Sequence, residues 1–187
     1  TFNRVTIDSD TSTNDTAIIF ANGASGAPAI SSQGPEYAVF LGAFREVCRE
    51  LALMMIRDGE GVRRIAEVVV KGARSSEDAL RVGRTIADSP LVKTALHGGD
   101  PNWGRILAAA GRAGVPFDID NVDIHIGDVF VCEGGVARVY DEATAHQAMI
   151  ADPGHLTVDL HTGDASESIW MCDLSDAYVD INAHYRT

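Results

Sequence analysis

The chain has 187 residues and carries 27 acidic against 15 basic side chains, a net charge of −12 with histidine neutral. With 45% hydrophobic and 22% charged residues, its composition is that of a globular protein, and its length predicts one domain spanning residues 1–187. The acidic balance argues against nucleic-acid and membrane partners, because binding to phosphates needs an excess of Lys and Arg. The longest apolar runs are also far short of the ~18 residues that a membrane span requires.

The three cysteines are odd in number and widely spaced, at Cys48, Cys132 and Cys172. Such spacing argues against a disulfide framework and against a zinc site, and it favours a reducing, cytoplasmic environment. We therefore expect a cytoplasmic protein without a bound metal.

The first third of the chain predicts two strands and one long helix. Val5 and Ile7 alternate with polar residues, as in a short half-buried strand. Residues 8–16 (DSDTSTNDT) are all polar and predict a loop, and Ala17–Ala21 then predicts a buried strand. From Pro35 to Arg57 apolar side chains recur every three or four positions, which predicts an amphipathic helix that begins at a proline and ends before Gly59.

The rest of the chain mixes strands and helices without regular βαβ alternation, which favours an α+β fold with layers of mixed sheet and helix. The expected elements are a strand at 65–71, a helix from Ser75 or Ser76 to about Asp88, a Pro/Gly-punctuated passage at 89–100, a helix at 103–112, a strand pair at 122–126 and 129–132, a helix at 141–150, and late strands at 155–161, at 168–173 and from Ala177 to near the end.

Thr1 stands where a chain normally carries Met, which indicates either a trimmed sequence or the downstream product of a cleavage. A threonine at a mature N-terminus can act as a nucleophile, with its own amine as the general base. Trimming exposes a threonine equally well, so position alone leaves both interpretations open.

Other segments combine polar side chains in patterns that also have structural explanations. The 8–16 loop could contact a cation or a phosphate, or could simply be solvated. Glu60 lies between Gly59 and Gly61, where a ligand has room to approach, although a helix cap and a turn explain both glycines. Two histidines and an aspartate share one face of the 155–161 strand and could bind a metal ion. However, any half-buried strand places its polar residues together on the face turned to solvent.

Taken together, the motifs closely resemble the β chain of the ornithine acetyltransferase family, the bifunctional glutamate N-acetyltransferases of arginine biosynthesis. The resemblance runs from the first residue to the last. The strings that carry it are FNR at 2–4, DSDTSTNDT at 8–16, ANGA at 21–24, DGEG at 58–61, SPLVKTA at 89–95, DPNWGR at 100–105 and YVDINAHYRT at 178–187.

The resemblance implies a precursor that cleaves itself into α and β chains, which assemble as a cytoplasmic α2β2 heterotetramer with a layered α/β sandwich fold. In such a protein a threonine takes the acetyl group from N-acetylornithine and passes it to glutamate in a ping-pong scheme. The resemblance implies no metal or organic cofactor, and some members also accept acetyl-CoA as a co-substrate.

Matching motifs imply that Glu60, Asn182 and Thr187 bind substrate. Thr1 belongs to the later Thr-Phe-Asn-Arg string and not to the family's nucleophile motif, so the catalytic threonine is expected to lie in residues absent from this chain. The resemblance places the oxyanion donors in the α chain, and Lys93 and Arg105 are interpreted as structural or interface residues.

Two other functions remain as alternatives from the residues. One is an N-terminal-nucleophile amidase or aminopeptidase of similar fold, in which water would replace glutamate as the acceptor. The other is a non-catalytic binding subunit that keeps the fold.

Overall fold

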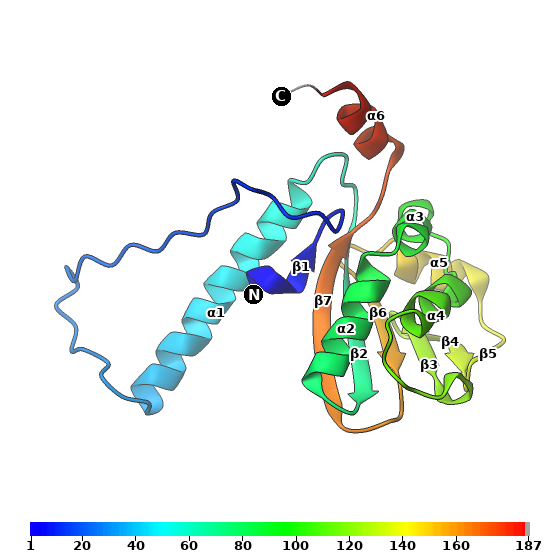
Figure 1. Cartoon of the computed structure of the whole chain (residues 1–187), viewed down its shortest axis with the longest axis horizontal. Coiled ribbons are helices and arrows are strands. Elements are labelled where there is room, and N and C mark those ends of the chain that lie inside the picture. Colours follow the sequence, from blue (N-terminus) through cyan, green and yellow to red (C-terminus); the bar gives the residue numbers. More distant parts are fainter. Residues whose placement is uncertain (186–187) are drawn as a thin grey trace.

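The computed structural model describes residues 1–185, and its centre is a seven-stranded mixed sheet (Figure 1). The strands follow the order β1-β7-β2-β6-β3-β4-β5 across the sheet. Their bounds are β1 Val5–Thr6, β2 Ile65–Ala73, β3 Asp123–Ile126, β4 Val129–Glu133, β5 Val136–Ala137, β6 Gly154–Asp159 and β7 Ala165–Cys172.

The central strand β2 pairs in parallel with β6 and antiparallel with β7, so the sheet mixes both directions. Six α-helices and two short 3-10 helices accompany it in the described residues. Their bounds are α1 Pro35–Arg57, α2 Ser76–Ala87, α3 Pro90–Gly98, α4 Trp103–Gly111, α5 Glu142–Met149, α6 Asp176–His184, η1 Phe2–Arg4 and η2 Ile119–Asn121. The mixed sheet with its helices confirms the predicted α+β class.

Helices lie on both faces of the sheet. Successive strand residues point to opposite sides, and apolar strand residues on each side pack against a helix. On one face, Val82 and Ile86 of α2 belong to the main core together with Val70 of β2 and Ile169 of β7. On the other face, Ile56 of α1 packs with Trp170 of β7 in a second, smaller core that also contains Ile65 and Cys172. This layered arrangement agrees with the predicted sandwich.

The last turns of α1 alone dock on the sheet, and the rest of this helix extends away from it (Figure 1). Residues 7–34, all within the described part of the chain, form neither helix nor strand and pass beside α1 as an extended segment. The predicted buried strand at Ala17–Ala21 is therefore wrong for this chain. Ile18 and Phe20 are 68% and 89% exposed, and no strand within residues 1–185 pairs with this segment.

Two further predictions differ from the structure. The segment from Ala177 is the helix α6 and not a strand, because Ser175 caps it by accepting a hydrogen bond from the Tyr178 N–H. The passage at 89–100 contains the helix α3, Pro90–Gly98, which is followed by Gly99 in the left-handed conformation, with φ +69°. The other predicted elements are present with shifts of a few residues at their ends.

Within residues 1–185 we find no helix with the length and apolarity that a membrane crossing demands.

Candidate functional site

Three segments far apart in the sequence meet at the end of the sheet where α6 lies: the loop after β1, the turn after α1 and the start of α6. Gly61 of the turn is at φ +69°, and a Cβ there would lie 2.5 Å from the Tyr178 nitrogen and 2.8 Å from Ser175 Oγ. Only a glycine allows the turn to approach α6 this closely. Ser175 Oγ donates to the Gly61 carbonyl over 2.6 Å, so the residue that caps α6 also joins it to the turn.

This contact brings Glu60 and Asn182 together. Asn182 Nδ2 donates to Glu60 Oε2 over 2.7 Å and to the Tyr178 carbonyl oxygen over 3.0 Å. Both side chains are exposed. We call Glu60 and Asn182 the acid–amide pair: it presents one negative charge and one neutral amide at the surface, 122 residues apart in sequence.

The loop after β1 adds further carboxylates to the same region. Tyr178 Oη donates to Asp8 Oδ2 over 2.9 Å, and the other Asp8 oxygen accepts from the Asp10 N–H over 3.0 Å. Burial and the hydrogen bond to Asp8 raise the pKa of Tyr178 to about 12, with smaller contributions from the charges of Asp10 and Glu60. An acidic rim of this kind favours a ligand that carries an ammonium group.

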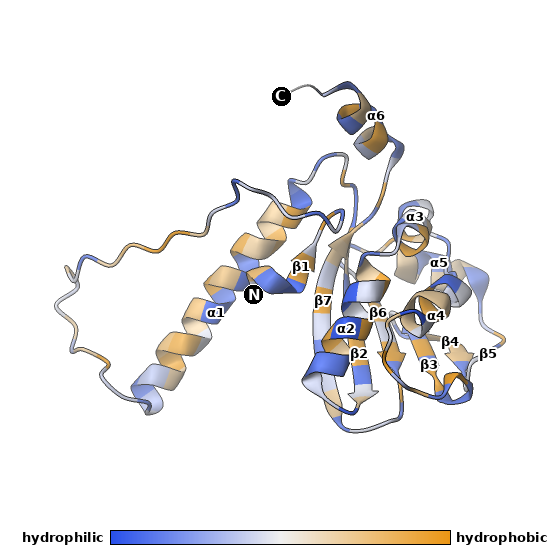
Figure 2. Ribbon diagram, in the orientation of Figure 1, coloured by the Kyte–Doolittle hydropathy of each residue, from blue (hydrophilic) through white to orange (hydrophobic). Residues whose placement is uncertain are grey.

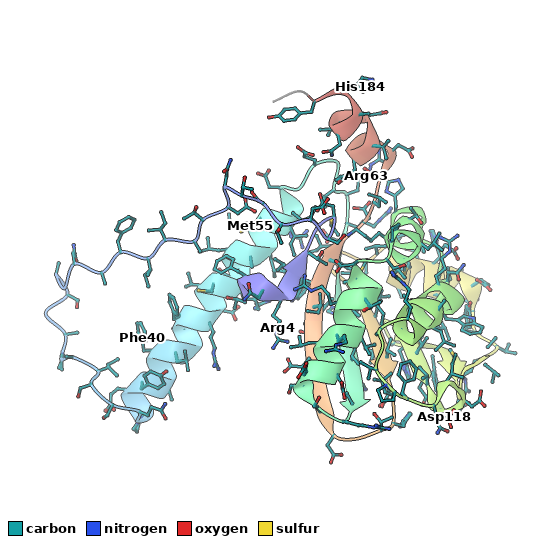
Figure 3. The ribbon with its side chains drawn as sticks, viewed as in Figure 1. Arg4, Phe40, Met55, Arg63, Asp118 and His184 are labelled. Carbon is teal, nitrogen blue, oxygen red and sulfur yellow. The ribbon has the colours of Figure 1, made fainter. Side chains whose placement is uncertain are left out.

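A buried aspartate holds the two strand ends from which the turn and α6 leave the sheet. Asp173 Oδ1 accepts from the backbone N–H groups of Arg63 and Arg64 at 2.9 and 3.1 Å, and Oδ2 lies 2.7 Å from His97 Nδ1. The Asp173 side chain is fully buried, and Arg63 lies between α6 and α3 in Figure 3. Asp173 therefore ties the start of β2 to the end of β7, next in the chain to the turn that carries Glu60 and to the start of α6.

Of the predicted substrate-binding residues, Glu60 and Asn182 come together, whereas Thr187 lies outside the described residues. Thr1 is exposed, and the N-terminus lies beside α1 and β1, away from α6 (Figure 1). Neither placement tests the predicted roles in binding.

Two residues interpreted as structural make internal contacts. Lys93 is buried, and its Nζ donates to the Cys172 carbonyl oxygen over 2.6 Å; burial lowers the pKa of Lys93. Arg105 donates to the Leu91 carbonyl oxygen over 3.0 Å. No group of three or more His, Cys, Asp or Glu side chains in the described part of the chain is arranged to hold a metal ion.

Sequence reasoning missed the pairing of Asp8 with Tyr178 and the anchoring role of Asp173. For Tyr178, the available signal was an aromatic residue at the start of a C-terminal segment that is too apolar to lie free in solvent. For Asp173, the signal was a single carboxylate directly after an apolar strand. Neither signal identifies a partner, because each contact spans more than 75 residues.

The fold and the site define a mixed α/β protein whose exposed acid–amide pair suits an amino-acid ligand. The ArgJ family matches residues 1–187, so the chain belongs to the ArgJ family. Arginine biosynthesis bifunctional proteins ArgJ from Pseudomonas fluorescens and Dehalococcoides mccartyi are each 46% identical over the whole chain. The chain spans about half the length of these curated relatives, 47% and 46% respectively.

A solved structure has the same fold. The arginine biosynthesis bifunctional protein argJ from Bacillus halodurans superposes with a TM-score of 0.94 at 39% sequence identity. The match covers 99% of this chain and 87% of that one. It therefore includes nearly all of α1 and of the extended segment beside it.

Proposed function

We propose that this chain is the part of an acetyltransferase that binds amino-acid substrates, in an enzyme that moves an acetyl group from N-acetylornithine to glutamate during arginine biosynthesis. The observation that carries the proposal is the acid–amide pair, with Asn182 Nδ2 2.7 Å from Glu60 Oε2, in a chain of the ArgJ family. The names of the relatives support the pathway, because each is called an arginine biosynthesis bifunctional protein.

The pair has the chemistry that the substrates require. N-acetylornithine and glutamate both present a carboxylate, and ornithine also presents an ammonium group. Glu60 pairs with the ammonium group, and Asp8 and Asp10 add to the negative potential around it. Asn182 donates to the substrate carboxylate without adding charge, and Thr187 contributes a second neutral donor.

The reaction proceeds in two half-reactions through an acetyl-threonine ester. In the first, the threonine oxygen bonds to the acetyl carbon, the acetyl–nitrogen bond breaks, and ornithine leaves with the proton. In the second, the glutamate amine attacks the ester, acetylglutamate leaves, and the threonine hydroxyl is restored. The nucleophile and the oxyanion donors belong to the part of the family sequence that this chain does not span.

The working enzyme is proposed to be a cytoplasmic α2β2 heterotetramer in which this chain is the β chain. The α chain comes from the same precursor. The chemistry needs no metal or organic cofactor, because the attacking threonine, the oxyanion donors and the substrate-binding groups are all protein groups. Acetyl-CoA is proposed only as an additional acetyl donor.

The test is to incubate the complete complex with N-acetylornithine and glutamate and to identify the products. Acetylglutamate supports the proposal. Free acetate would instead indicate an amidase in which water is the acceptor, and neither product would indicate a non-catalytic binding subunit. The assignment of the pair is tested with Glu60→Gln, for which we expect the KM for N-acetylornithine to rise by about tenfold or more.

A further inference from the structure

The turn between α3 and α4 and the start of α5 line a pocket that the proposed function leaves without a role. The three helices lie together on one side of the molecule (Figure 1). The pocket contains most of the DPNWGR string at 100–105 and has a volume of about 280 Å³. We call it the α4–α5 pocket, and its lining includes Asp100, Asn102, Trp103, Tyr140 and Glu142.

The packing of Gly99 on α5 brings the two parts of the pocket together. Gly99 is in the left-handed conformation, and a Cβ there would lie only 2.5 Å from His146 Cε1. The Gly99 carbonyl oxygen accepts a hydrogen bond from His146 Nδ1 over 2.7 Å, so this nitrogen carries the proton. The buried side of α5 belongs to the main core. These contacts fix the start of α5, with Glu142, beside the turn that carries Asp100.

Two aromatic side chains line the pocket. Trp103 and Tyr140 are both half-buried, and both pack against the main core, which supports their rings. The part of α4 that follows Trp103 is largely apolar (Figure 2), with Ile106 and Leu107 buried in the same core. An aromatic ring attracts a cation that lies over its face, and this attraction is stronger where water is excluded.

Two exposed carboxylates, those of Asp100 and Glu142, line the same pocket. Neither forms an ion pair within residues 1–185. Asp100 Oδ2 accepts a hydrogen bond from the neutral Asn102 Nδ2 over 3.0 Å. Burial raises the pKa of Tyr140, and the charges of Glu142 and Asp100 raise it further, so both carboxylates act on the space around this hydroxyl. The pocket therefore combines two negative charges with two aromatic rings.

Carboxylates near the start of a helix also have a structural explanation, because they offset the positive end of the helix dipole. Other side chains already cap both helices. At α4, Asn102 Oδ1 accepts from the Arg105 N–H over 3.1 Å, and at α5, Asp141 Oδ1 accepts from the Thr144 N–H over 2.7 Å. Two full charges also outweigh two helix ends, each equivalent to about half an elementary charge. Both carboxylates of the pocket therefore remain available for a ligand.

This lining favours a guanidinium group over other cations. A guanidinium is planar, stacks on aromatic faces and is more weakly hydrated than an ammonium group. Its N–H groups also form a fork that matches the oxygens of a carboxylate. The volume of about 280 Å³ lies just below the usual range for ligand pockets, roughly 300–1,000 Å³, and so suits a group of the size of one side chain.

We propose that the α4–α5 pocket binds a guanidinium group, with Asp100 and Glu142 as its acceptors and the rings of Trp103 and Tyr140 against its face. The group belongs either to a free molecule such as arginine or to an arginine side chain of another polypeptide, and the chemistry of recognition is the same in both cases. The inference does not depend on the proposed function.

The test measures binding of a guanidinium probe to the complete complex by isothermal titration calorimetry. The probe is Nα-acetyl-L-arginine amide, and its neutral counterpart is Nα-acetyl-L-citrulline amide, whose urea group has nearly the same shape. We expect a Kd of about 1 mM or lower for the charged probe, and binding of the neutral counterpart that is weaker by about tenfold or more. Free L-arginine distinguishes the two sources. Tighter binding of L-arginine than of the probe indicates a free ligand, and tighter binding of the probe indicates an arginine side chain; both results support the site.

Variants then locate the binding. Asp100→Asn and Glu142→Gln each remove one charge from the pocket, and each should weaken binding of the probe by about fivefold or more. The matched control is Glu77→Gln, which removes a charge from the first turn of α2. Tyr140→Phe keeps the ring and should bind like the wild type, whereas Tyr140→Leu should weaken binding by about threefold. Thermal unfolding checks that each variant keeps its fold.

The inference is overturned if the charged and neutral probes bind equally, or if no saturable binding occurs up to about 10 mM. It is also overturned if Asp100→Asn and Glu142→Gln bind the probe as well as Glu77→Gln does. Loss of binding in Glu60→Gln alone would mean that the probe occupies the acid–amide pair and would overturn it too. Binding is scored without an activity assay, so a complex that binds the probe but makes no acetylglutamate contradicts the proposed function alone.

Discussion

Tyr178 Oη donates to Asp8 Oδ2 over 2.9 Å and so joins α6 to the loop after β1, 170 residues apart. The contact fixes the helix that carries Asn182. Because the phenol is protonated in this bond, and because burial and Asp8 raise the pKa of Tyr178 to about 12, the contribution of this residue to stability depends on pH.

We expect Tyr178→Phe to lower the free energy of unfolding by about 1 kcal/mol at neutral pH, through loss of the hydrogen bond. The pKa of Tyr178 is higher in the folded state than in the unfolded chain. The contribution is therefore complete below the unfolded value of about 10 and disappears as the pH rises through about 12, where a phenolate would face the Asp8 carboxylate. Denaturant unfolding of both proteins from pH 7 to pH 12 measures this. Tyr185→Phe serves as the control, and a wild-type advantage that does not shrink above pH 10 would contradict the assignment.

A second prediction concerns charge in the acid–amide pair. Asn182→Asp would place a carboxylate within about 3 Å of Glu60, so one of the two carboxyls must hold a proton or the pair must separate. We expect the KM for N-acetylornithine to rise by about tenfold at pH 8 and to fall toward that of Asn182→Ala near pH 5, where one carboxyl becomes protonated. Steady-state kinetics of the complete enzyme at both pH values provide the measurement. A KM ratio of the two variants that is the same at both pH values would falsify the contact.

The turn that carries Glu60 should be intolerant of any side chain at Gly61. Gly61→Ala combines a left-handed backbone with a Cβ 2.5 Å from the Tyr178 nitrogen, and we expect a loss of about 2–4 kcal/mol in the free energy of unfolding. Gly42→Ala is the matched control, because its Cβ would meet nothing within 4 Å in the middle of α1. There we expect a gain of about 0.5–1 kcal/mol from helix propensity. Thermal unfolding of both variants checks the prediction, and equal effects would mean that Gly61 is not a close-approach position.

The buried carboxylate of Asp173 should be important for stability and not for charge recognition. Asp173→Ala leaves the N–H groups of Arg63 and Arg64 without their acceptor, and we expect a loss of about 3 kcal/mol. Asp173→Asn retains an oxygen that can accept from both N–H groups, so its free energy of unfolding should fall clearly less than that of Asp173→Ala. Chemical denaturation of the two variants distinguishes these outcomes. If both variants lose the same free energy of unfolding, the carboxylate charge of Asp173 beside His97 contributes more to stability than the hydrogen bonds from the Arg63 and Arg64 N–H groups.

The sequence predicted elements well where a pattern and its boundary signals lie close together. The long helix from Pro35 to Arg57 has a proline at its start and an apolar residue every three or four positions, and the structure shows the same bounds. The strand predicted from Ala177 is wrong because the apolar residues of this segment also suit a short helix. The N-cap at Ser175 favours the helix over the strand. Ala17–Ala21 has the composition of a buried strand, yet burial depends on a partner surface that a local pattern does not contain.

For the site, the amino-acid sequence by itself determined the residue types: an acid between two glycines, an amide near the C-terminus and an acidic loop near the N-terminus. Only the tertiary structure decided that these belong together. Gly61 lets the turn reach α6, Asp173 clamps the two strand ends next to them in the chain, and Asn182 thereby meets Glu60. The physical reason is that propensity and periodicity act over a few neighbouring residues, whereas these hydrogen bonds join residues more than 100 positions apart, whose proximity depends on how the whole sheet is ordered.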